Sequence, residues 1–159
     1  MRTAQLKNLL KNQKGFTLIE LLVVIGILAI LLAIVLIAIN PARQFGQANN
    51  TRRQSDVTQV LNAIGAYAAD NAGQLPAGIP LNTATPPSAD ASFVCADIVP
   101  DYIASLPVDP TVNGGAAYTT CPATPASGDT GYTVSRDADN HVTVTSTSTD
   151  NGATISVTR

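Results

Sequence analysis

The chain has 159 residues, of which 45% are hydrophobic and only 13% are charged, and its formal net charge is −2. This length allows one ordinary domain together with a membrane segment. Residues 1–15 contain four bases and no acid, whereas all eleven acids follow. An acidic body behind a short basic leader argues against general nucleic-acid binding, so no nucleic-acid partner is expected.

An apolar run extends from Phe16 to Ile39, directly after the basic leader. It is interrupted only by Thr17, Glu20 and Gly26. As a helix it would be about 36 Å long, enough to cross a hydrocarbon core of about 30 Å. The run is longer than the apolar part of a secretory signal peptide, so we expect the mature protein to keep it. The basic leader stays in the cytoplasm, and the remainder is exported.

Asn40-Pro41 follows the apolar run and predicts a kink or a restart of the helix. Proline removes a backbone donor, but Asn before Pro also suits the first positions of a new helix. We therefore expect residues 40–72 to form the amphipathic half of one long helix, ending before Gly73 and Pro76. Its single apolar stripe follows helical spacing and consists of Val57, Val60, Leu61, Ile64 and Tyr67.

The last third of the chain alternates between apolar and polar residues. The apolar pairs at 132/134, 142/144 and 155/157 predict three antiparallel strands, with turns at 137–140 and 150–152. Residues 76–92 are rich in Pro, Ala, Thr and Ser and predict an irregular loop. Because so small a sheet is not stable alone, it should pack on the apolar stripe of the helix. The fold class expected is α+β, with a headpiece over residues 73–159.

Cys95 and Cys121 both lie in the exported part of the chain. In an oxidising compartment an even pair most simply forms a disulfide. It would close a loop of about 25 residues and stabilise the headpiece by about 3 kcal/mol. The alternative is two separate buried thiols. A zinc-type metal site is not expected, because His141 is the only histidine and no C-x-x-C spacing exists.

Glu20 is the residue that most needs an explanation. A carboxylate within a membrane-length apolar helix is unfavourable by roughly 2.5–3.5 kcal/mol on insertion scales, so it requires a partner. The surrounding segment, Lys14-Gly15-Phe16-Thr17-Leu18-Ile19-Glu20, closely resembles the prepilin signature of type IV pilins and type II secretion pseudopilins. The stretch from Val99 to Pro110 is similar, more weakly, to the loop that enters the sheet in minor pilins and major pseudopilins.

The resemblance implies a maturation pathway and a set of partners. Prepilin peptidase would remove residues 1–15 by cutting after Gly15, and the same enzyme would methylate the new amine of Phe16. Residues 16–39 would first span the membrane and then form the filament core with identical subunits, through an inner-membrane assembly platform. Glu20 would pair with the amine of Phe16 in a neighbouring subunit and set the axial register, because neither charge is tolerated alone.

These expectations describe a structural protein rather than an enzyme, since no nucleophile motif is present. The protein would be a single-pass precursor in the cytoplasmic membrane and then a subunit of an extracellular or periplasmic filament. A major pseudopilin of a type II secretion system is the alternative within the family. A monomeric, membrane-anchored binding domain is the alternative from another class, and Glu20 would then be a carboxylate that reaches back to the membrane interface.

Two further sets of charged residues could bind a ligand, but each has a simpler explanation. Major pseudopilins bind calcium beside the sheet, and Asp109, Asp129, Asp137 and Asp139 are oxygen donors in that region. A turn explains 137–140 more simply, so no metal or cofactor is expected. The arginines of the amphipathic helix would lie on a solvated face or pair with a neighbour's acid, rather than contact DNA; they are Arg43, Arg52 and Arg53.

Overall fold

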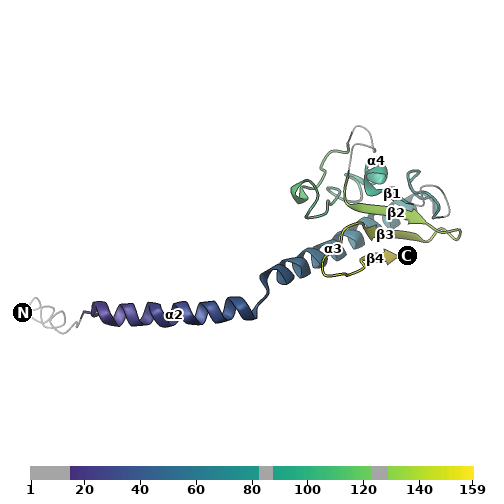
Figure 1. Ribbon diagram of the computed structural model, residues 1–159. Helices are drawn as coiled ribbons and strands as arrows, with labels where there is room; N and C mark the ends of the chain where they lie inside the picture. Colours follow the sequence, from purple (N-terminus) through teal and green to yellow (C-terminus); the bar gives the residue numbers. More distant parts are fainter. Residues whose placement is uncertain (1–14, 83–87, 123–128) are drawn as a thin grey trace, which may run out of the picture. The chain divides into compact units, whose positions relative to one another are not determined.

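The structure is a computed structural model that describes residues 15–82, 88–122 and 129–159. It divides into two compact units, Met1–Pro41 and Ala42–Arg159. The described part of the first unit, from residue 15 onward, contains one long apolar helix. The second, the headpiece, contains a polar helix, a small sheet and the loops between them (Figure 1).

Helix α2 spans Leu18–Ala38 and has no buried residue. It begins where Thr17 caps it, and it ends at Ile39, whose backbone is extended with φ −100° and ψ 105°. The helix is long and apolar enough to cross a membrane, by its length and composition. Its aliphatic side chains therefore find no apolar partner within the described chain, and they need a bilayer or another protein to cover them.

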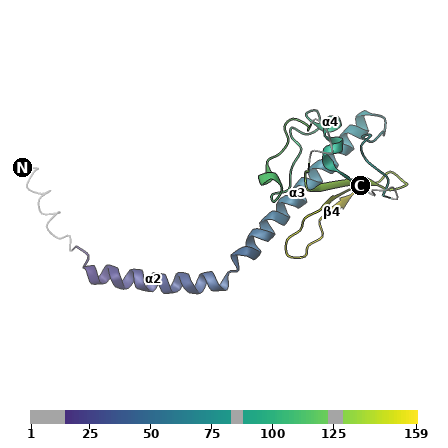
Figure 2. The ribbon, with the colours of Figure 1, turned by 45° about the horizontal axis from the view of Figure 1, so that its top comes forward.

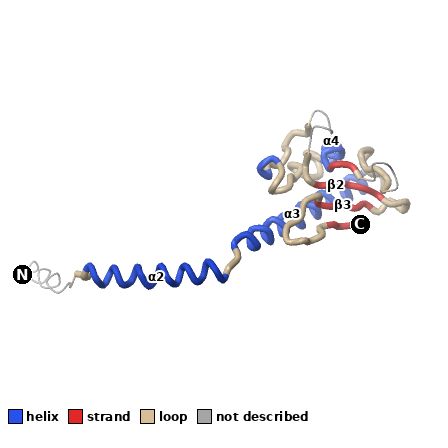
Figure 3. Tube along the Cα trace, viewed as in Figure 1, coloured by secondary structure: helices blue, strands red, loops and turns tan. Residues whose placement is uncertain are grey.

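Helix α3 spans Pro41–Asp70, so the chain does restart a helix at the predicted proline. Figure 3 shows the short non-helical segment between α2 and α3. The helix ends at Asp70, and the following Ala72 and Gly73 have positive φ angles of 54° and 85°. Gly73 N–H donates to the carbonyl of Ala68, which closes the last turn.

The sheet has four antiparallel strands in the order β1-β2-β3-β4. They are β1 Ala89–Asp90, β2 Tyr132–Arg136, β3 Val142–Ser146 and β4 Ser156–Thr158. The prediction of three strands was incomplete, because β1 lies in the segment expected to be an irregular loop. A two-residue strand shows no alternation that a sequence pattern could detect. Figures 1 and 3 show β1 at the edge of the sheet opposite β4.

The core of the headpiece lies between α3 and one face of this sheet. The predicted stripe on α3 packs there, with Val57, Val60, Leu61 and Ile64 buried and Tyr67 at the margin. Alternate residues of β2 and β3 meet it, namely Tyr132, Val134, Val142 and Val144, together with the short helices η2 (Ala91–Val94) and α4 (Cys95–Ile98). The opposite face of these strands carries Ser and Thr side chains.

Candidate functional site

The predicted processing site lies just ahead of α2. Gly15, Phe16 and Thr17 are outside the helix and exposed. The Thr17 hydroxyl oxygen accepts a hydrogen bond from the backbone N–H of Glu20 at 3.2 Å, and the hydroxyl donates to Oε2 of Glu20 at 3.4 Å. The carboxylate thus stabilises the first turn of the helix, where a negative charge also suits the helix dipole.

This local role of Glu20 was not predicted, although the sequence contained a signal for it. A Thr followed three residues later by Glu is the capping-box spacing, and it occurs here as Thr17 and Glu20. Within the described residues, the contacts of Glu20 are with Thr17 alone. The contact is long and exposed, so the carboxylate keeps acceptor capacity for a partner outside the chain.

Arg53 is the centre of a buried polar network in the headpiece. Its side chain is 1% exposed. The guanidinium binds Asp109 in a bidentate manner, with Nε donating to Oδ2 at 2.6 Å and Nη2 donating to Oδ1 at 3.1 Å. Nη1 donates to Oδ2 of Asp150 at 2.7 Å and to Oδ1 of Asn50 at 3.0 Å. Arg53 therefore connects α3 with two loops that are distant in sequence.

The loop between β3 and β4 is also held directly against α3, as Figure 2 shows in yellow. Nδ2 of Asn50 donates to the carbonyl of Asp150 at 2.7 Å, and Oδ1 of Asn50 accepts the N–H of Asp150 at 3.0 Å. Gly46 permits this approach, because a Cβ on it would lie 2.8 Å from Nδ2 of Asn151 and 2.9 Å from Cβ of Asp150.

The electrostatics of this network favour the ionised forms. Burial alone would raise the pKa of Asp109, but hydrogen bonds from Arg53 and Thr111 outweigh it and hold the pKa below the ordinary value. The hydrogen bond from Arg53 also lowers the pKa of Asp150, and the bond to Asp109 raises the pKa of Arg53. The buried pair is therefore a permanent feature of the folded headpiece at neutral pH.

The expectation for Arg53 was wrong. The Arg53 side chain is buried rather than on a solvated face, and it pairs with acids of its own chain rather than with an acid of a neighbour. The adjacent Arg52 fits the expectation better: its side chain is 49% exposed, and it donates to the carbonyl of Gly115 at 2.8 Å. Arg52 is also 3.8 Å from Asp56, which accepts the hydroxyl of Tyr132 at 2.7 Å. Burial raises the pKa of both Asp56 and Tyr132.

The four acids considered as calcium ligands do not converge on one site, although Asp137 and Asp139 lie close together. Asp109 is buried on Arg53 and Thr111, and Asp129 accepts the N–H of Gly131. Asp137 and Asp139 lie in the turn between β2 and β3, where their oxygens and a nitrogen of His141 fall within 4.8 Å of one another. His141 Nδ1 is 2.8 Å from Oδ2 of Asp137, so these side chains already form a local turn network.

The two cysteines are joined in the structure, with an S–S distance of 2.08 Å. Cys95 begins α4 and is fully buried in the core, whereas Cys121 lies in the loop that follows Tyr118. Leu106 and Tyr118 exchange backbone hydrogen bonds across that loop. The disulfide thus holds the loop to α4 and to the core of the headpiece.

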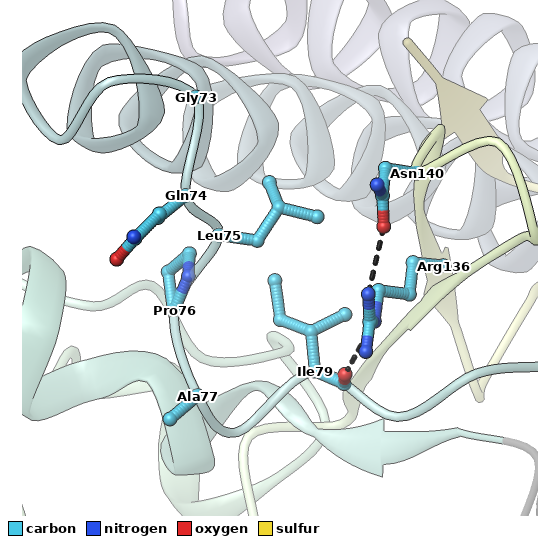
Figure 4. Close-up of a pocket in the computed structure, with 8 residues that line it drawn as sticks. All are labelled: Gly73, Gln74, Leu75, Pro76, Ala77, Ile79, Arg136 and Asn140. Carbon is cyan, nitrogen blue, oxygen red and sulfur yellow. Dashed lines mark hydrogen bonds between the residues drawn. The ribbon is translucent and has the colours of Figure 1, made fainter.

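Figure 4 shows the residues that line a pocket beyond the end of α3. The volume of this pocket is about 390 Å³. Leu75 and Ile79 point into it, and Arg136 forms one wall. The guanidinium of Arg136 donates to the carbonyl of Ile79 at 3.2 Å and to Oδ1 of Asn140 at 2.7 Å. Among the described residues that line this cavity, none carries a carboxylate, thiol, hydroxyl or imidazole, so these residues supply no nucleophile or general base.

The sequence model of the prokaryotic N-terminal methylation motif matches residues 10–36. No curated protein sequence and no solved structure gives a significant match to the chain. The matched motif is the hallmark of type IV pilin and pseudopilin prepilins. It covers the last six residues of the predicted leader, the predicted cleavage site and most of α2.

The fold and the motif together define the class of the protein. A long apolar helix precedes a small antiparallel sheet, an α+β arrangement consistent with the pilin fold. The match to the N-terminal methylation motif supports a pilin-like or pseudopilin precursor and does not distinguish the two. The motif and α2 indicate a membrane-anchored precursor that is processed by prepilin peptidase. Proteins with this motif are structural rather than enzymatic.

Proposed function

We propose that this protein is the structural subunit of a type IV pilus-like surface filament. In this proposal the leader is cut after Gly15, Phe16 is N-methylated, and the subunits polymerise through α2. The observation that carries the proposal is that α2 is apolar apart from Glu20 and has no buried residue, while the headpiece completes its own core. A helix with this composition has to be covered by lipid or by other copies of itself.

Glu20 supports assembly over simple anchoring. In a plain anchor the carboxylate would weaken insertion, and its benefit would be limited to the first turn of α2, where it contacts Thr17. In a bundle of identical helices, the amine of Phe16 and the carboxylate of Glu20 neutralise each other once per subunit. A single ion pair in an apolar bundle is a strong determinant of register, since every misaligned packing leaves a charge unpaired.

The test is the isolation of surface filaments from cells that express the full chain, followed by mass measurement of the N-terminal peptide. The expected peptide begins at Phe16 and carries one methyl group on its amine. A dominant filament subunit that begins at Met1, or the absence of this chain from all filaments, would refute the proposal.

A secretion pseudopilus is the second candidate, because the matched motif is common to pilins and pseudopilins. The two assignments differ in what deletion removes. Deletion of a pilin should abolish surface filaments and leave protein export intact. Deletion of a major pseudopilin should prevent the release of folded exoproteins from the cell. Comparing filament yield and exoprotein release in one deletion strain separates the two assignments.

A further inference from the structure

Arg136, the last residue of β2, has a positive charge that no acid of the chain neutralises. All eleven acids lie among the described residues. The ion pairs of the described chain do not include Arg136, so no carboxylate oxygen lies within 4.0 Å of its guanidinium. Asp137 and Asp139, which follow it in the turn, converge on His141 instead. The charge of Arg136 is therefore available to an anion from outside the chain.

The pocket beyond α3 has one wall whose polar side chains offer hydrogen-bond donors. The guanidinium of Arg136 is held by the carbonyl of Ile79 and by Oδ1 of Asn140, which use two of its five N–H groups. Because Oδ1 of Asn140 accepts this bond, the donor nitrogen Nδ2 of the same amide has no partner among the described residues. Figure 4 shows both side chains on one side of the pocket, with Gln74 pointing away from it. This wall suits a carboxylate, which accepts several hydrogen bonds at once.

A second, apolar recess adjoins this pocket. Leu75 and Asn140 line both, and the recess has a volume of about 190 Å³. Its other lining residues are mainly aliphatic and come from α3, from the start of β3 and from the residue after β4; they are Leu61, Ile64, Gly65, Ala68, Val142 and Arg159. Moving an aliphatic group from water into such a recess is favourable in proportion to the area that is covered. The two pockets together therefore suit a ligand with a carboxylate at one end and a short aliphatic chain at the other.

We propose that the pocket and the recess form a binding site for a short aliphatic carboxylate. The carboxylate accepts hydrogen bonds from the guanidinium of Arg136 and the amide of Asn140. The aliphatic chain enters the recess between α3 and β3, where Leu61, Ala68 and Val142 cover it. This inference concerns the headpiece alone, and it does not depend on the filament proposed above.

Chemical modification of arginine tests this site in the full chain, reconstituted in phosphatidylcholine vesicles. Phenylglyoxal modifies guanidinium groups, and mass spectrometry of the peptides gives a separate rate for each arginine. The probe is hexanoate. Acetate is the control without a chain, and 1-hexanol is the control without a charge, all at an ionic strength held constant with NaCl. Arg52 is the internal control, because its side chain is 49% exposed and contacts Gly115 rather than the pocket.

Hexanoate should slow the modification of Arg136 several-fold and leave Arg52 unchanged. Half-maximal protection should need about tenfold less hexanoate than acetate, because the added methylene groups enter the recess. Protection by 1-hexanol equal to that by hexanoate, or protection of Arg159 in place of Arg136, would overturn the proposal. Equal potency of acetate and hexanoate would also overturn it, and would assign the site to any carboxylate, including an acidic side chain of another protein. An Arg136 that does not react even without ligand would show that its guanidinium is closed to the pocket, which is equally incompatible with the proposal.

The apolar recess has its own readout. Ala68→Leu fills the recess, so it should raise the half-protecting concentration of hexanoate toward that of acetate and leave protection by acetate unchanged. Ala69→Leu is the matched control, because Ala69 is exposed on the same helix and lies outside the recess. Recovery of the Cys95–Cys121 peptide from both variants verifies that the headpiece has folded. Unchanged protection by hexanoate in folded Ala68→Leu would overturn the placement of the aliphatic chain in the recess.

Discussion

Glu20 and Asp109 place the two units of this molecule in contrast. Asp109 is a fully buried carboxylate, and Arg53 of the same chain is its bidentate partner. Glu20 is a carboxylate within the apolar helix α2. Glu20 has only a 3.4 Å contact with the hydroxyl of Thr17. The headpiece neutralises the charge of Asp109 internally, whereas Glu20 has no cationic partner among the residues that the structure describes.

The same difference extends to the apolar surface. The headpiece buries its aliphatic residues in one core between α3 and the sheet. In α2, exposure reaches 86% at Ile37, and none of its residues is buried. A self-contained unit and an incomplete unit are thus joined in one chain. Substitutions should act differently on the two: those in α2 should affect assembly, and those in the headpiece should affect the free energy of unfolding.

The largest effect is expected at Glu20, and the substitution by Gln separates its two roles. Gln suits the capping box but has no charge to pair with an amine. If Glu20 pairs with Phe16 of a neighbour, both Glu20→Val and Glu20→Gln should abolish or sharply reduce surface filaments, with cleaved protein retained in the membrane. An unpaired buried cation at every subunit is worth several kcal/mol of penalty.

Filament yield and total subunit should be measured together in these strains. Thr17→Ala is the matched control, because it removes the cap and keeps the charge; it should weaken the helix start by about 1 kcal/mol and leave filaments in place. Normal filaments in Glu20→Gln cells would contradict the pairing and would leave helix capping as the role of Glu20.

The next largest effect is expected within the headpiece, at Arg53. Arg53→Met leaves Asp109 buried without its cation and should lower the free energy of unfolding by about 3–5 kcal/mol. Arg52→Met is the matched control on the neighbouring residue, and it should change stability by less than about 1 kcal/mol because that side chain is half exposed. Chemical denaturation followed by circular dichroism measures both.

Adding Asp109→Asn to Arg53→Met should recover part of the loss, since it removes the buried negative charge. Losses of equal size for Arg53→Met and Arg52→Met would show that the network contributes no more than a surface contact.

A somewhat smaller effect is expected from the disulfide. Replacing Cys95 and Cys121 together by Ala should destabilise the headpiece by about 3 kcal/mol, mainly because the unfolded chain regains the freedom of the closed loop. Membrane insertion of α2 should not change. Protease resistance of the headpiece, compared with the fraction of protein in the membrane pellet, distinguishes the two outcomes; a parallel loss of both would contradict independent units.

The smallest effect is expected in the turn between β2 and β3. The hydrogen bond with Asp137 raises the pKa of His141 above its ordinary 6.5, and the same bond lowers the pKa of Asp137 below 3.8. A raised histidine pKa stabilises the fold below pH 6.5, and this contribution disappears as the pH rises through the folded pKa. The lowered pKa of Asp137 acts above pH 3.8 and is lost as the pH falls.

The pair is therefore strongest between these two limits. Nuclear magnetic resonance titration of His141 should show a raised pKa that returns toward 6.5 in Asp137→Asn. Asp139→Asn is the control, because its charge contributes less to the shift than the direct hydrogen bond does. A His141 titration that is unaffected by Asp137→Asn would rule out the pair in solution.

The sequence predicted the architecture well because its signals are local. The apolar run, the restart at Pro41 and the alternation in β2 and β3 each follow from the periodicity of neighbouring residues. Strand β1 was missed because two residues carry no period. Its pairing with Val134 depends on where the chain after α3 returns to the sheet, and composition does not encode this.

Arg53 shows a different limit. Asn50, Arg53, Val57, Val60 and Ile64 follow one another at steps of three and four, so Arg53 lies in phase with the buried stripe. The sequence shows that Arg53 shares the helical spacing of the buried stripe. A search for apolar residues does not detect it, because Arg53 is polar. Its partners Asp109 and Asp150 lie 56 and 97 residues away, and only the folded chain identifies them.

The extended residue between α2 and α3 determines how a subunit responds to tension. A helical residue advances about 1.5 Å and an extended one about 3.3 Å, so a pulled chain lengthens by unwinding helix. The backbone of Ile39 is already extended, so this residue can lengthen very little under tension. On α3, residues 41–45 are exposed, and the first packed residue is Gly46. Unwinding these five residues would release roughly 9 Å per subunit before the load reaches the contacts of Gly46, Asn50 and Arg53 with the β3–β4 loop. In the filament proposed above, the buried network would thereby act as a mechanical stop that limits stretch and protects the headpiece from unfolding.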